Sequence, residues 1–149
     1  MKSDLRDNFI IREFHDTDYE GITKVWEPTG LGNPERGDDR STIEGTIKLG
    51  GCLLVAEEKV TGTIVGTSWI TNDGRRLFLH HFGILPEFQG RGVSDSLMKE
   101  SLSFVKMKRL QVKLEVHSSN HKAINLYKKF GFRYLGDYNV FIIRDLSAL

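Results

Sequence analysis

The most constraining feature of the sequence is a glycine-rich turn, Gln89-Gly90-Arg91-Gly92-Val93-Ser94, which stands between a strand pattern and a helix pattern. Leu77–Leu85 before the turn is predicted as a strand, and Val93 to about Met107 carries apolar residues three or four apart, as in an amphipathic helix. A helix start leaves unpaired amides and carries the positive end of the helix dipole, so a glycine turn there can wrap an anion. This order therefore predicts strands and helices in one fold, with an anion site where the helix begins.

Two other phosphate-binding motifs do not fit this turn. A P-loop needs four residues between its glycines and then Gly-Lys-Ser/Thr, and that order is absent. A dinucleotide fingerprint needs a third small residue at the position that Asp95 occupies, and a carboxylate there would sit poorly against the pyrophosphate of a dinucleotide. The glycines alone fit a plain strand-to-helix turn equally well, so the surrounding pattern has to decide.

The other elements are predicted from hydrophobic spacing and turn residues. Further strands are expected at Phe9–Glu13, Cys52–Glu57, Ile64–Asn72, Gln111–His117, Phe132–Leu135 and Val140–Arg144. Further helices are expected around Tyr19–Trp26, from Ser41 to Lys48, and around Ala123–Phe130. Asp16 or Thr17 is expected to cap the first of these, Ser41 and Glu44 to form a capping box at the second, and Gly131 to end the third.

This element order predicts an α+β (mixed α/β) fold with a largely antiparallel sheet flanked by about four helices. A chain of 149 residues with 39% hydrophobic residues can bury one proper core, so a single domain over residues 1–149 is expected. Cys52 is the only cysteine and lies in an apolar run, which favours a core position over a reactive thiol.

The charge balance argues against polyanionic partners. Lysine and arginine total 21 and aspartate and glutamate total 20, so the sequence offers no broad positive surface for nucleic acid or an anionic membrane. The polar segment Met1–Asn8 is unlike a signal peptide, and no apolar run is long enough to span a bilayer. A small-molecule or protein partner and a cytoplasmic location are expected.

Two segments of the second half resemble a known family. Gln89–Ser94 is similar to the Gln/Arg-x-x-Gly-x-Gly/Ala loop with which the GNAT superfamily of N-acetyltransferases binds the pyrophosphate of acetyl-CoA, although Ser94 replaces the usual glycine or alanine. Leu114–Phe132 is similar to the second cofactor segment of that family, especially in its peptide N-terminal acetyltransferases. The resemblance implies a splayed sheet that admits acetyl-CoA as co-substrate where the central strands part.

The resemblance also implies roles for individual residues. The loop residues Gln89, Gly90, Arg91, Gly92, Val93 and Ser94 would bind the pyrophosphate. Backbone amides near Phe82, Gly83 and Ile84 would bind pantetheine and polarise the thioester carbonyl, and Asn120 would hydrogen-bond the pantetheine arm. Tyr127 matches the tyrosine that protonates the departing thiolate, although its spacing from Ala123 and Phe130 also fits a core aromatic.

Two residues compete for the role of general base. Glu115 matches the glutamate of N-terminal acetyltransferases, although a glutamate on a half-exposed strand is often merely solvated. His80 is expected to share a strand face with Phe82 and Ile84, and its ordinary pKa suits a base. His81 is expected on the opposite face. A base acting through water, or no base at all, stays open.

Two further groups of polar residues receive no catalytic role. His117 and His121 are four residues apart but fall across a strand end and a helix start, so no metal site is expected. The loop Glu27–Arg40 holds acidic residues that would attract a cationic amine, namely Glu35, Asp38 and Asp39. Arginines in the same loop offset this negative charge, so an ordinary solvated loop is the favoured interpretation.

The resulting hypothesis is transfer of an acetyl group from acetyl-CoA to a primary amine by direct attack in a ternary complex. A protein N-terminus or lysine leads as the acceptor, with a polyamine, aminoglycoside or amino acid as the alternative. A CoA-binding sensor without catalysis is the alternative from another class, and retention of Tyr127 speaks against it. A homodimer stays open, and neither fold nor motif identifies the acceptor.

Overall fold

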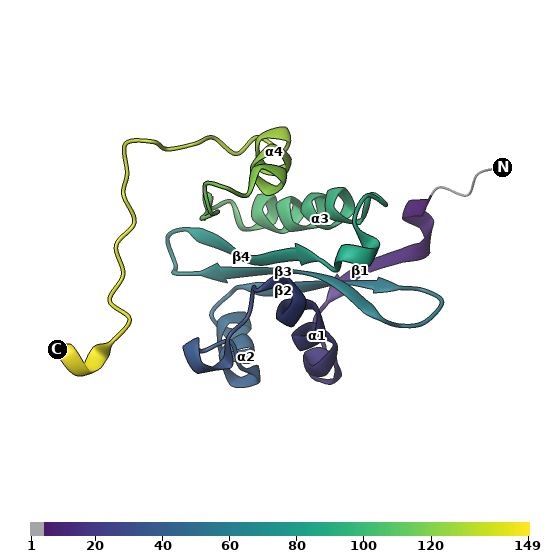
Figure 1. The fold of residues 1–149 in the computed structure, drawn as a ribbon, viewed down its shortest axis with the longest axis horizontal. Coiled ribbons are helices and arrows are strands. Elements are labelled where there is room, and N and C mark those ends of the chain that lie inside the picture. Colours follow the sequence, from purple (N-terminus) through teal and green to yellow (C-terminus); the bar gives the residue numbers. More distant parts are fainter. Residues whose placement is uncertain (1–4) are drawn as a thin grey trace. The chain divides into compact units, whose positions relative to one another are not determined.

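The computed structural model describes residues 5–149, and within them the strands form one five-stranded sheet (Figure 1). Its strands are β1 (Phe9–Glu13), β2 (Cys52–Glu58), β3 (Ile64–Asn72), β4 (Leu77–Ile84) and β5 (Val112–Leu114). They lie side by side in chain order, with antiparallel pairing from β1 to β4 and parallel pairing between β4 and β5. The expected α+β fold with a mostly antiparallel sheet is confirmed.

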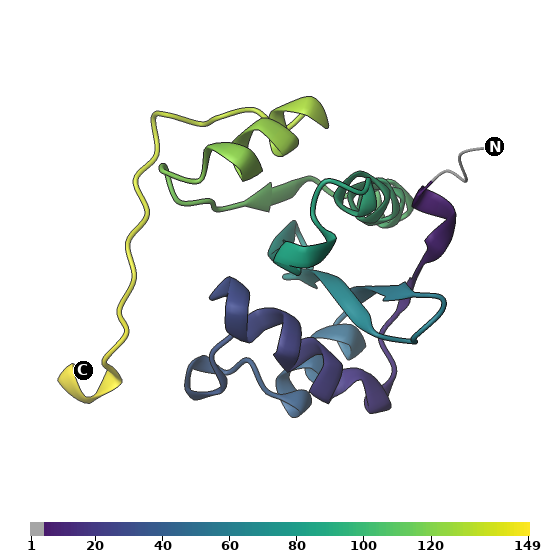
Figure 2. The same cartoon turned by 45° about the vertical axis from the view of Figure 1, so that its right-hand side comes forward.

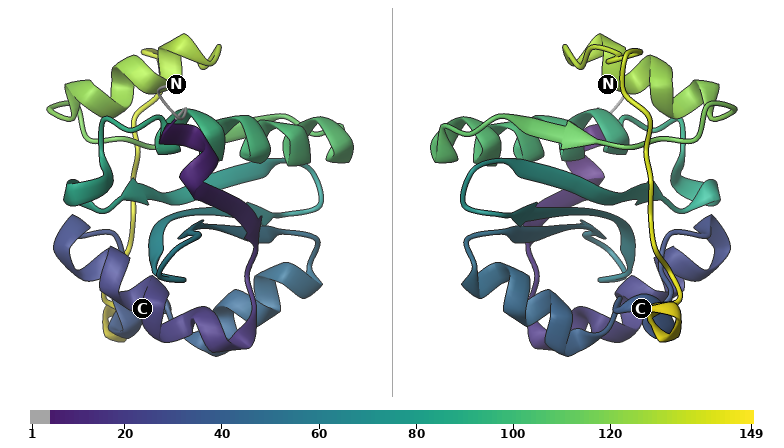
Figure 3. Two further views of the ribbon diagram at one scale, coloured as in Figure 1. Left: turned by 90° about the vertical axis from the view of Figure 1, so that its right-hand side faces the viewer. Right: turned by 90° about the vertical axis from the view of Figure 1, so that its left-hand side faces the viewer.

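Helices cover both faces of this sheet (Figure 3). α1 (Tyr19–Thr29) and α2 (Arg40–Lys48) lie on one face, and α3 (Val93–Lys108) lies on the other. Short 3₁₀ turns precede or connect the longer elements, namely η1 (Leu5–Asn8), η2 (Asp16–Asp18), η3 (Pro34–Arg36) and η4 (Pro86–Phe88). The central strand β3 is therefore buried along most of its length.

A hydrophobic core fills the space between the sheet and the pair α1 and α2. Its buried residues are Ile22, Val25, Trp26, Ile43, Leu53, Val55, Ile64 and Trp69. The indole rings of Trp26 and Trp69 stack with centroids 5.8 Å apart, and each indole N–H donates to a threonine hydroxyl. Burial of an indole requires such a partner for its N–H, so these bonds fix α1 and α2 against β3.

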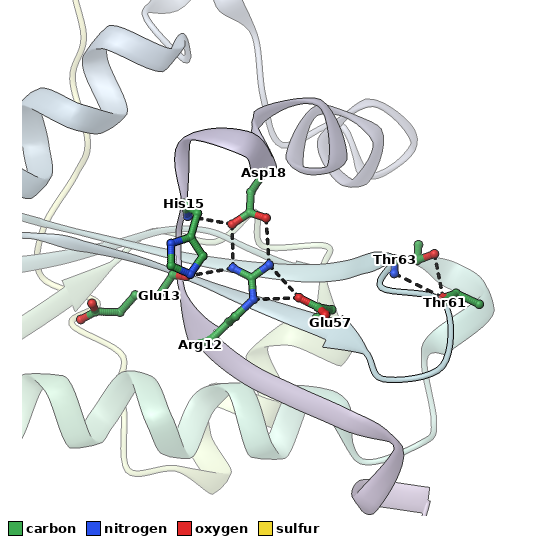
Figure 4. A network of polar contacts seen from close by, with 7 residues as sticks. All are labelled: Arg12, Glu13, His15, Asp18, Glu57, Thr61 and Thr63. Carbon is green, nitrogen blue, oxygen red and sulfur yellow. Dashed lines mark hydrogen bonds and ion pairs between the residues drawn. The ribbon is translucent and has the colours of Figure 1, made fainter.

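An arginine on the first strand ties three elements together (Figure 4). Arg12 donates through both terminal nitrogens to the carboxylate of Asp18, at 2.7 and 2.8 Å, and through Nε to Glu57 at 2.7 Å. Asp18 is only 7% exposed, and the hydrogen bonds from Arg12 lower the pKa of its carboxyl group. The network joins β1, β2 and the turn before α1. The buried carboxylate of Asp18 depends on Arg12 for the positive charge that balances it.

The chain forms two compact units, the first ending at Glu115 and the second spanning Val116–Leu149. The second unit contains α4 (His121–Lys129) and η5 (Leu146–Ala148). Gly131 has a φ of +95° and follows α4, and the amide of Phe132 donates to the carbonyl of Tyr127 at 3.0 Å. These features are those of a glycine-terminated helix, so the predicted end of this helix is confirmed. A single domain over residues 1–149 stays a prediction.

The two strands predicted at the end of the chain are wrong. Phe132–Leu135 and Val140–Arg144 form no strand, and Figure 2 shows an extended stretch between α4 and η5. Within the described residues no strand pairs with this stretch, and apolar side chains such as Tyr134 and Phe141 are 88% and 90% exposed. The residue types favour a strand here, but a strand forms its backbone hydrogen bonds only where a neighbouring strand is present. The strand predicted at Gln111–His117 is likewise shorter, since β5 ends at Leu114.

Two predicted helix starts and one predicted helix end are also corrected. Asp39, and not Ser41, caps α2, because its carboxylate accepts from the amide of Thr42 at 2.8 Å. Asp18 occupies the capping position of α1 in place of Asp16 or Thr17, while its carboxylate is bound to Arg12. α1 also continues to Thr29, so the following loop begins at Gly30 and not at Glu27.

Candidate active site

The edge strand β5 is much shorter than β4, and this difference creates the central feature of the site. β5 pairs with Leu77–Leu79 of β4 and then ends, whereas β4 continues to Ile84. Beyond Leu79 the strand neighbour of β4 in the described sheet is β3 alone, which pairs with Gly83 and Ile84. The pairing between β4 and β5 therefore stops at Leu79, and the sheet opens on the β5 side of the second half of β4.

A bulge interrupts β4 just before this opening. Thr67 pairs with Gly83 and Trp69 pairs with His80, so β4 places two residues, His81 and Phe82, opposite the single residue Ser68. His81 has a φ of +47°, in the left-handed region that non-glycine residues rarely adopt. A bulge with such a residue bends the strand and changes the direction of the side chains that follow.

The bulge overturns the prediction that His80 and His81 face opposite sides. Both rings lie against Trp69, with centroid distances of 6.3 Å for His80 and 5.1 Å for His81. The sequence gives no clear signal for this shift. Helices cover both faces of the sheet, so apolar residues such as Leu79 and Ile84 are buried whichever face they occupy.

His81 is held in its strained conformation by contacts from several elements. Its carbonyl accepts a hydrogen bond from the hydroxyl of Thr67 at 2.7 Å, and that hydroxyl in turn accepts from the indole of Trp26 at 2.8 Å. Its ring lies 4.7 Å from the ring of Trp26, and its Nε2 lies 3.2 Å from the carboxylate of Asp38. Strain of this kind persists only where the surroundings fix it, and it is common at functional sites.

The sequence named Asp38 only as one of three acidic residues in a solvated loop, and its surroundings in the structure correct that view of the loop. Its side chain is 17% exposed and accepts from the amide of Asn33 at 2.7 Å besides contacting His81. The same loop reaches β4 a second time, because a side chain at Gly83 would collide with Leu31 at 2.5 Å. The loop between α1 and α2 therefore lies directly against the open end of β4.

His80 lies in a partly buried position on β4. Its Nε2 is 2.9 Å from the hydroxyl of Thr71, and its ring stacks on Phe78 with centroids 4.2 Å apart. Burial, together with the neighbouring His81, lowers the pKa of His80 to about 4. The imidazole is therefore neutral near pH 7 and can accept a proton, but it is a much weaker base than an exposed histidine.

The glycine turn lies between β4 and α3, in the order of strand, turn and helix that the sequence predicted. Gly90 and Gly92 have φ values of +76° and +81°, which glycine adopts at little cost. Gln89 closes the turn by donating from Nε2 to the carbonyl of Ile84 at 3.0 Å. Arg91 is exposed, with its guanidinium 5.0 Å from the centroid of Phe88.

The start of α3 can receive an anion. Gly92 stands at the capping position and has no side chain to bond the amides of the first turn, and α3 extends over 16 residues. Its positive end therefore points into the turn that Gly90 and Gly92 shape. Val93 is buried and Ser94 half-buried, so the helix start is anchored in the core while the turn itself is exposed.

The other predicted site residues, Glu115, Asn120 and Tyr127, differ in their exposure and contacts. Glu115 is exposed and follows the end of β5. Asn120, in the second unit, caps α4 through its side-chain carbonyl, which accepts from Ala123 at 3.2 Å, so its amide nitrogen is the donor left for a ligand. Tyr127 is 9% exposed, its ring meets Phe132 edge-on, and burial raises its pKa to about 12.

The structure therefore brings His80, His81, the segment Phe82–Ile84 and the glycine turn into one unit. Asn120 and Tyr127 belong to the other unit, on α4. Within residues 5–149 no group of three or more histidine, cysteine, aspartate or glutamate side chains is placed to hold a metal ion. No helix in that range is long and apolar enough to cross a membrane.

Comparisons with known proteins agree with this fold. Residues 12–132 match the family model described as the acetyltransferase (GNAT) family. An acetyltransferase of the GNAT family from Staphylococcus aureus Mu50 superposes with a TM-score of 0.75 at 18% identity, covering 88% of each chain. Ard1 from Thermoplasma volcanium superposes with a TM-score of 0.71 at 25% identity, covering 85% of this chain and 83% of its own.

A third neighbour was solved with a ligand related to CoA. AAC(6')-Iy, in complex with the bisubstrate analogue CoA-S-monomethyl-acetylneamine, superposes with a TM-score of 0.72 at 17% identity, covering 92% of this chain and 97% of its own. At this identity the likeness concerns the fold alone. The family match spans most of the sequence, from the first strand to the end of α4, and the chain belongs to the GNAT family of acetyltransferases.

Proposed function

We propose that the protein transfers the acetyl group of acetyl-CoA to a primary amine by direct attack within a ternary complex. One structural observation supports this proposal. An open strand end, a glycine turn and a helix start without a capping side chain follow one another in one continuous segment, Phe82–Ser94. Such a segment offers backbone donors to an extended chain and to a phosphate at its end. Acetyl-CoA combines these two groups and supplies an activated thioester.

The residues present fit that co-substrate. The amides of the glycine turn and of the first turn of α3 would hold the pyrophosphate, with Arg91 adding positive charge from an exposed position. Phe82, Gly83 and Ile84 would pair with the pantetheine arm as a strand would, and Asn120 would donate from its amide nitrogen. Backbone donors aimed at the thioester carbonyl would stabilise the charge that develops on its oxygen.

Tyr127 is the proposed general acid. Its raised pKa of about 12 keeps the phenol protonated at neutral pH, which is the form that donates a proton to the departing thiolate. Its burial and its contact with Phe132 hold the ring in one orientation. The packing role and the catalytic role are compatible, because the hydroxyl alone takes part in the transfer.

The general base is proposed to be Glu115 or His80. The low pKa of His80 makes it the weaker candidate, because a base of pKa about 4 draws a proton poorly from an ammonium group. Glu115 is exposed at the end of β5, close to where the sheet opens beside β4. An acceptor that arrives already neutral would need neither residue.

The proposed acceptor is a protein N-terminus or lysine, with a small amine as the alternative. The test is a thiol-release assay in which acetyl-CoA is offered to N-terminal peptides, lysine peptides and small amines. Release of CoA that depends on one acceptor class, with acetylation of its amine shown by mass spectrometry, is the expected result. Thiol release that is equal with and without every acceptor would contradict transfer to an amine.

A further inference from the structure

A hollow at the start of β4 carries charge that the transfer described above does not use. It has a volume of about 310 Å³ and lies beside the turn between β3 and β4. Sites for small ligands begin at roughly this size, about 300 Å³. Three of its lining residues are cationic, namely Arg75, Arg76 and Lys113, and we call the site the basic hollow.

Only one negative side chain offsets these three cations among the lining residues. Asp73 uses its carboxylate to accept from the backbone amides of Arg75 and Arg76, at 2.7 and 2.6 Å. These bonds stabilise the turn and lower the pKa of Asp73, so this carboxylate is charged and already engaged. Within the described residues no carboxylate forms an ion pair with Arg75, Arg76 or Lys113.

The basic hollow adjoins the proposed site of acetyl transfer. His80 and Phe78 form part of its wall, and Phe82, where the open end of β4 begins, is two residues beyond His80. Two residues of strand span about 7 Å, and the bulge at His81 shortens that path. A small molecule bound in the hollow would therefore place a second functional group beside the open strand if a few bonds separate its two ends.

The wall of the hollow is suited to such a molecule. Phe78 presents an aromatic face, and Lys113 Nζ lies 5.8 Å from the centroid of its ring. His80 is neutral near pH 7 and adds no charge, so the side chains that line the hollow carry three positive charges against the single negative charge of Asp73. Guanidinium groups match the paired oxygens of a carboxylate or phosphate, and cationic ligands would be repelled.

We propose that the basic hollow binds an anionic group, a carboxylate or a phosphate, on a small acceptor whose primary amine is a few bonds away. This inference rests on the proposed function, because it names the class of amine that the transferase would acetylate. It favours the alternative acceptor class, a small amine, over a protein N-terminus or lysine. Among small amines it selects those that carry an acidic group and disfavours polyamines and other polycations. Neither the family match nor the fold specifies this preference.

The first experiment compares acceptors of similar length that differ in the group opposite the amine. 4-Aminobutyrate, 3-aminopropyl phosphate, butylamine and 1,4-diaminobutane are offered at equal concentration with saturating acetyl-CoA. We expect kcat/KM to be at least about fivefold higher for the two anionic acceptors than for butylamine, and lowest for the diamine. The carboxylate and phosphate arms show which anion the hollow prefers. Equal kcat/KM for butylamine and both anionic acceptors would overturn the inference while leaving the proposed function intact.

Matched variants locate the effect. Arg76→Gln and Lys113→Gln should each raise KM for the anionic acceptors by about three- to tenfold without changing kcat/KM for butylamine. Lys59→Gln, which removes an exposed lysine outside the hollow, should change neither value. If both variants keep the wild-type preference for anionic acceptors, the anionic group does not bind in the basic hollow.

A binding measurement that needs no turnover completes the test. Inorganic phosphate and acetate are titrated into the protein, and the backbone amide resonances of residues 71–80 are followed by NMR. We expect saturable shifts in this segment that Arg76→Gln weakens and Lys59→Gln preserves. Absence of shifts would overturn the anion site, even if no acceptor in the panel is acetylated. Absence of acetyl-CoA binding beside normal phosphate shifts would instead overturn the proposed function.

Discussion

Among single residues, Tyr127 is the one whose packing role and proposed catalytic role can be separated most clearly. Its ring is buried against Phe132, while its hydroxyl is the part that a proton transfer would use. Tyr127→Phe should keep the packing and the affinity for acetyl-CoA but lower kcat by about 10² to 10⁴, the usual contribution of one positioned acid. Steady-state kinetics and thermal unfolding of the same preparation separate these effects. An unchanged kcat would reduce Tyr127 to a core residue.

The two candidate bases differ in strength, and their variants should differ in rate. Because the pKa of His80 is about 4, His80→Gln is expected to lower kcat/KM only a few-fold, whereas Glu115→Gln should cost about 10²-fold. The comparison is made with acetyl-CoA saturating and with acceptors of different basicity, since the amine's own ionisation also shapes the pH profile. A larger loss in His80→Gln would reverse the assignment.

The lowered pKa of His80 also predicts how stability depends on pH. The unfolded chain takes up a proton near pH 6.5, whereas the folded protein does so only near pH 4, so acid favours the unfolded state between these values. The free energy of unfolding should be fully retained above about pH 6.5 and should fall as the pH drops toward 4. Urea titrations at pH 7 and pH 5 measure this fall. In His80→Gln the fall should be smaller, and an equal fall in both proteins would contradict the burial of this imidazole.

At the scale of elements, β1, β2 and α1 depend on the charge of Arg12. Arg12→Gln would leave the carboxylate of Asp18, which is 7% exposed, without its partner and should destabilise the protein by about 3 kcal/mol. Lys24→Gln, at an exposed position of α1, should change stability by less than about 0.5 kcal/mol and is the control. Both values come from urea unfolding. A loss in Arg12→Gln no larger than in the control would show that the network is dispensable.

The sequence predicted those elements whose local pattern is sufficient to define them. The bounds of β1 and β3 are as expected, and α2, α3 and α4 end within about a turn of the prediction, because their apolar spacing and turn residues are local signals. The two C-terminal strands failed because residues such as Phe141 and Ile143 favour a strand only where a neighbour supplies the ladder. Whether a neighbouring strand is present cannot be predicted from the residues of the segment itself.

The candidate site was predictable in part for the same reason. The glycine turn was predictable from its spacing and from its place between a strand and a helix, and the positive φ values of Gly90 and Gly92 are compatible with such a turn. The bulge at His81 and the contact between His81 and Asp38 arise from packing of α1, its following loop and β4. Residues 43 positions apart in sequence cannot be paired by reading either segment alone.

For the whole molecule, the proposed activity requires that acetyl-CoA bind at the glycine turn. Acetyl-CoA that binds the folded protein at about a hundred times its dissociation constant should stabilise it by roughly 2.7 kcal/mol. For a domain of this size that stabilisation raises Tm by several degrees. The glycine turn and the start of α3 are the part of the chain on which this effect should depend.

The most direct test is therefore the Tm shift produced by acetyl-CoA in the wild type, Gly92→Asn and Gly92→Asp. Asparagine and aspartate are nearly the same size and both tolerate the φ of +81° at this position, so the pair isolates the effect of charge. We expect a shift of several degrees in the wild type, most of it retained in Gly92→Asn and lost in Gly92→Asp, where a carboxylate repels the pyrophosphate. No shift in a normally folding wild type, or an undiminished shift in Gly92→Asp, would contradict acetyl-CoA binding at this turn.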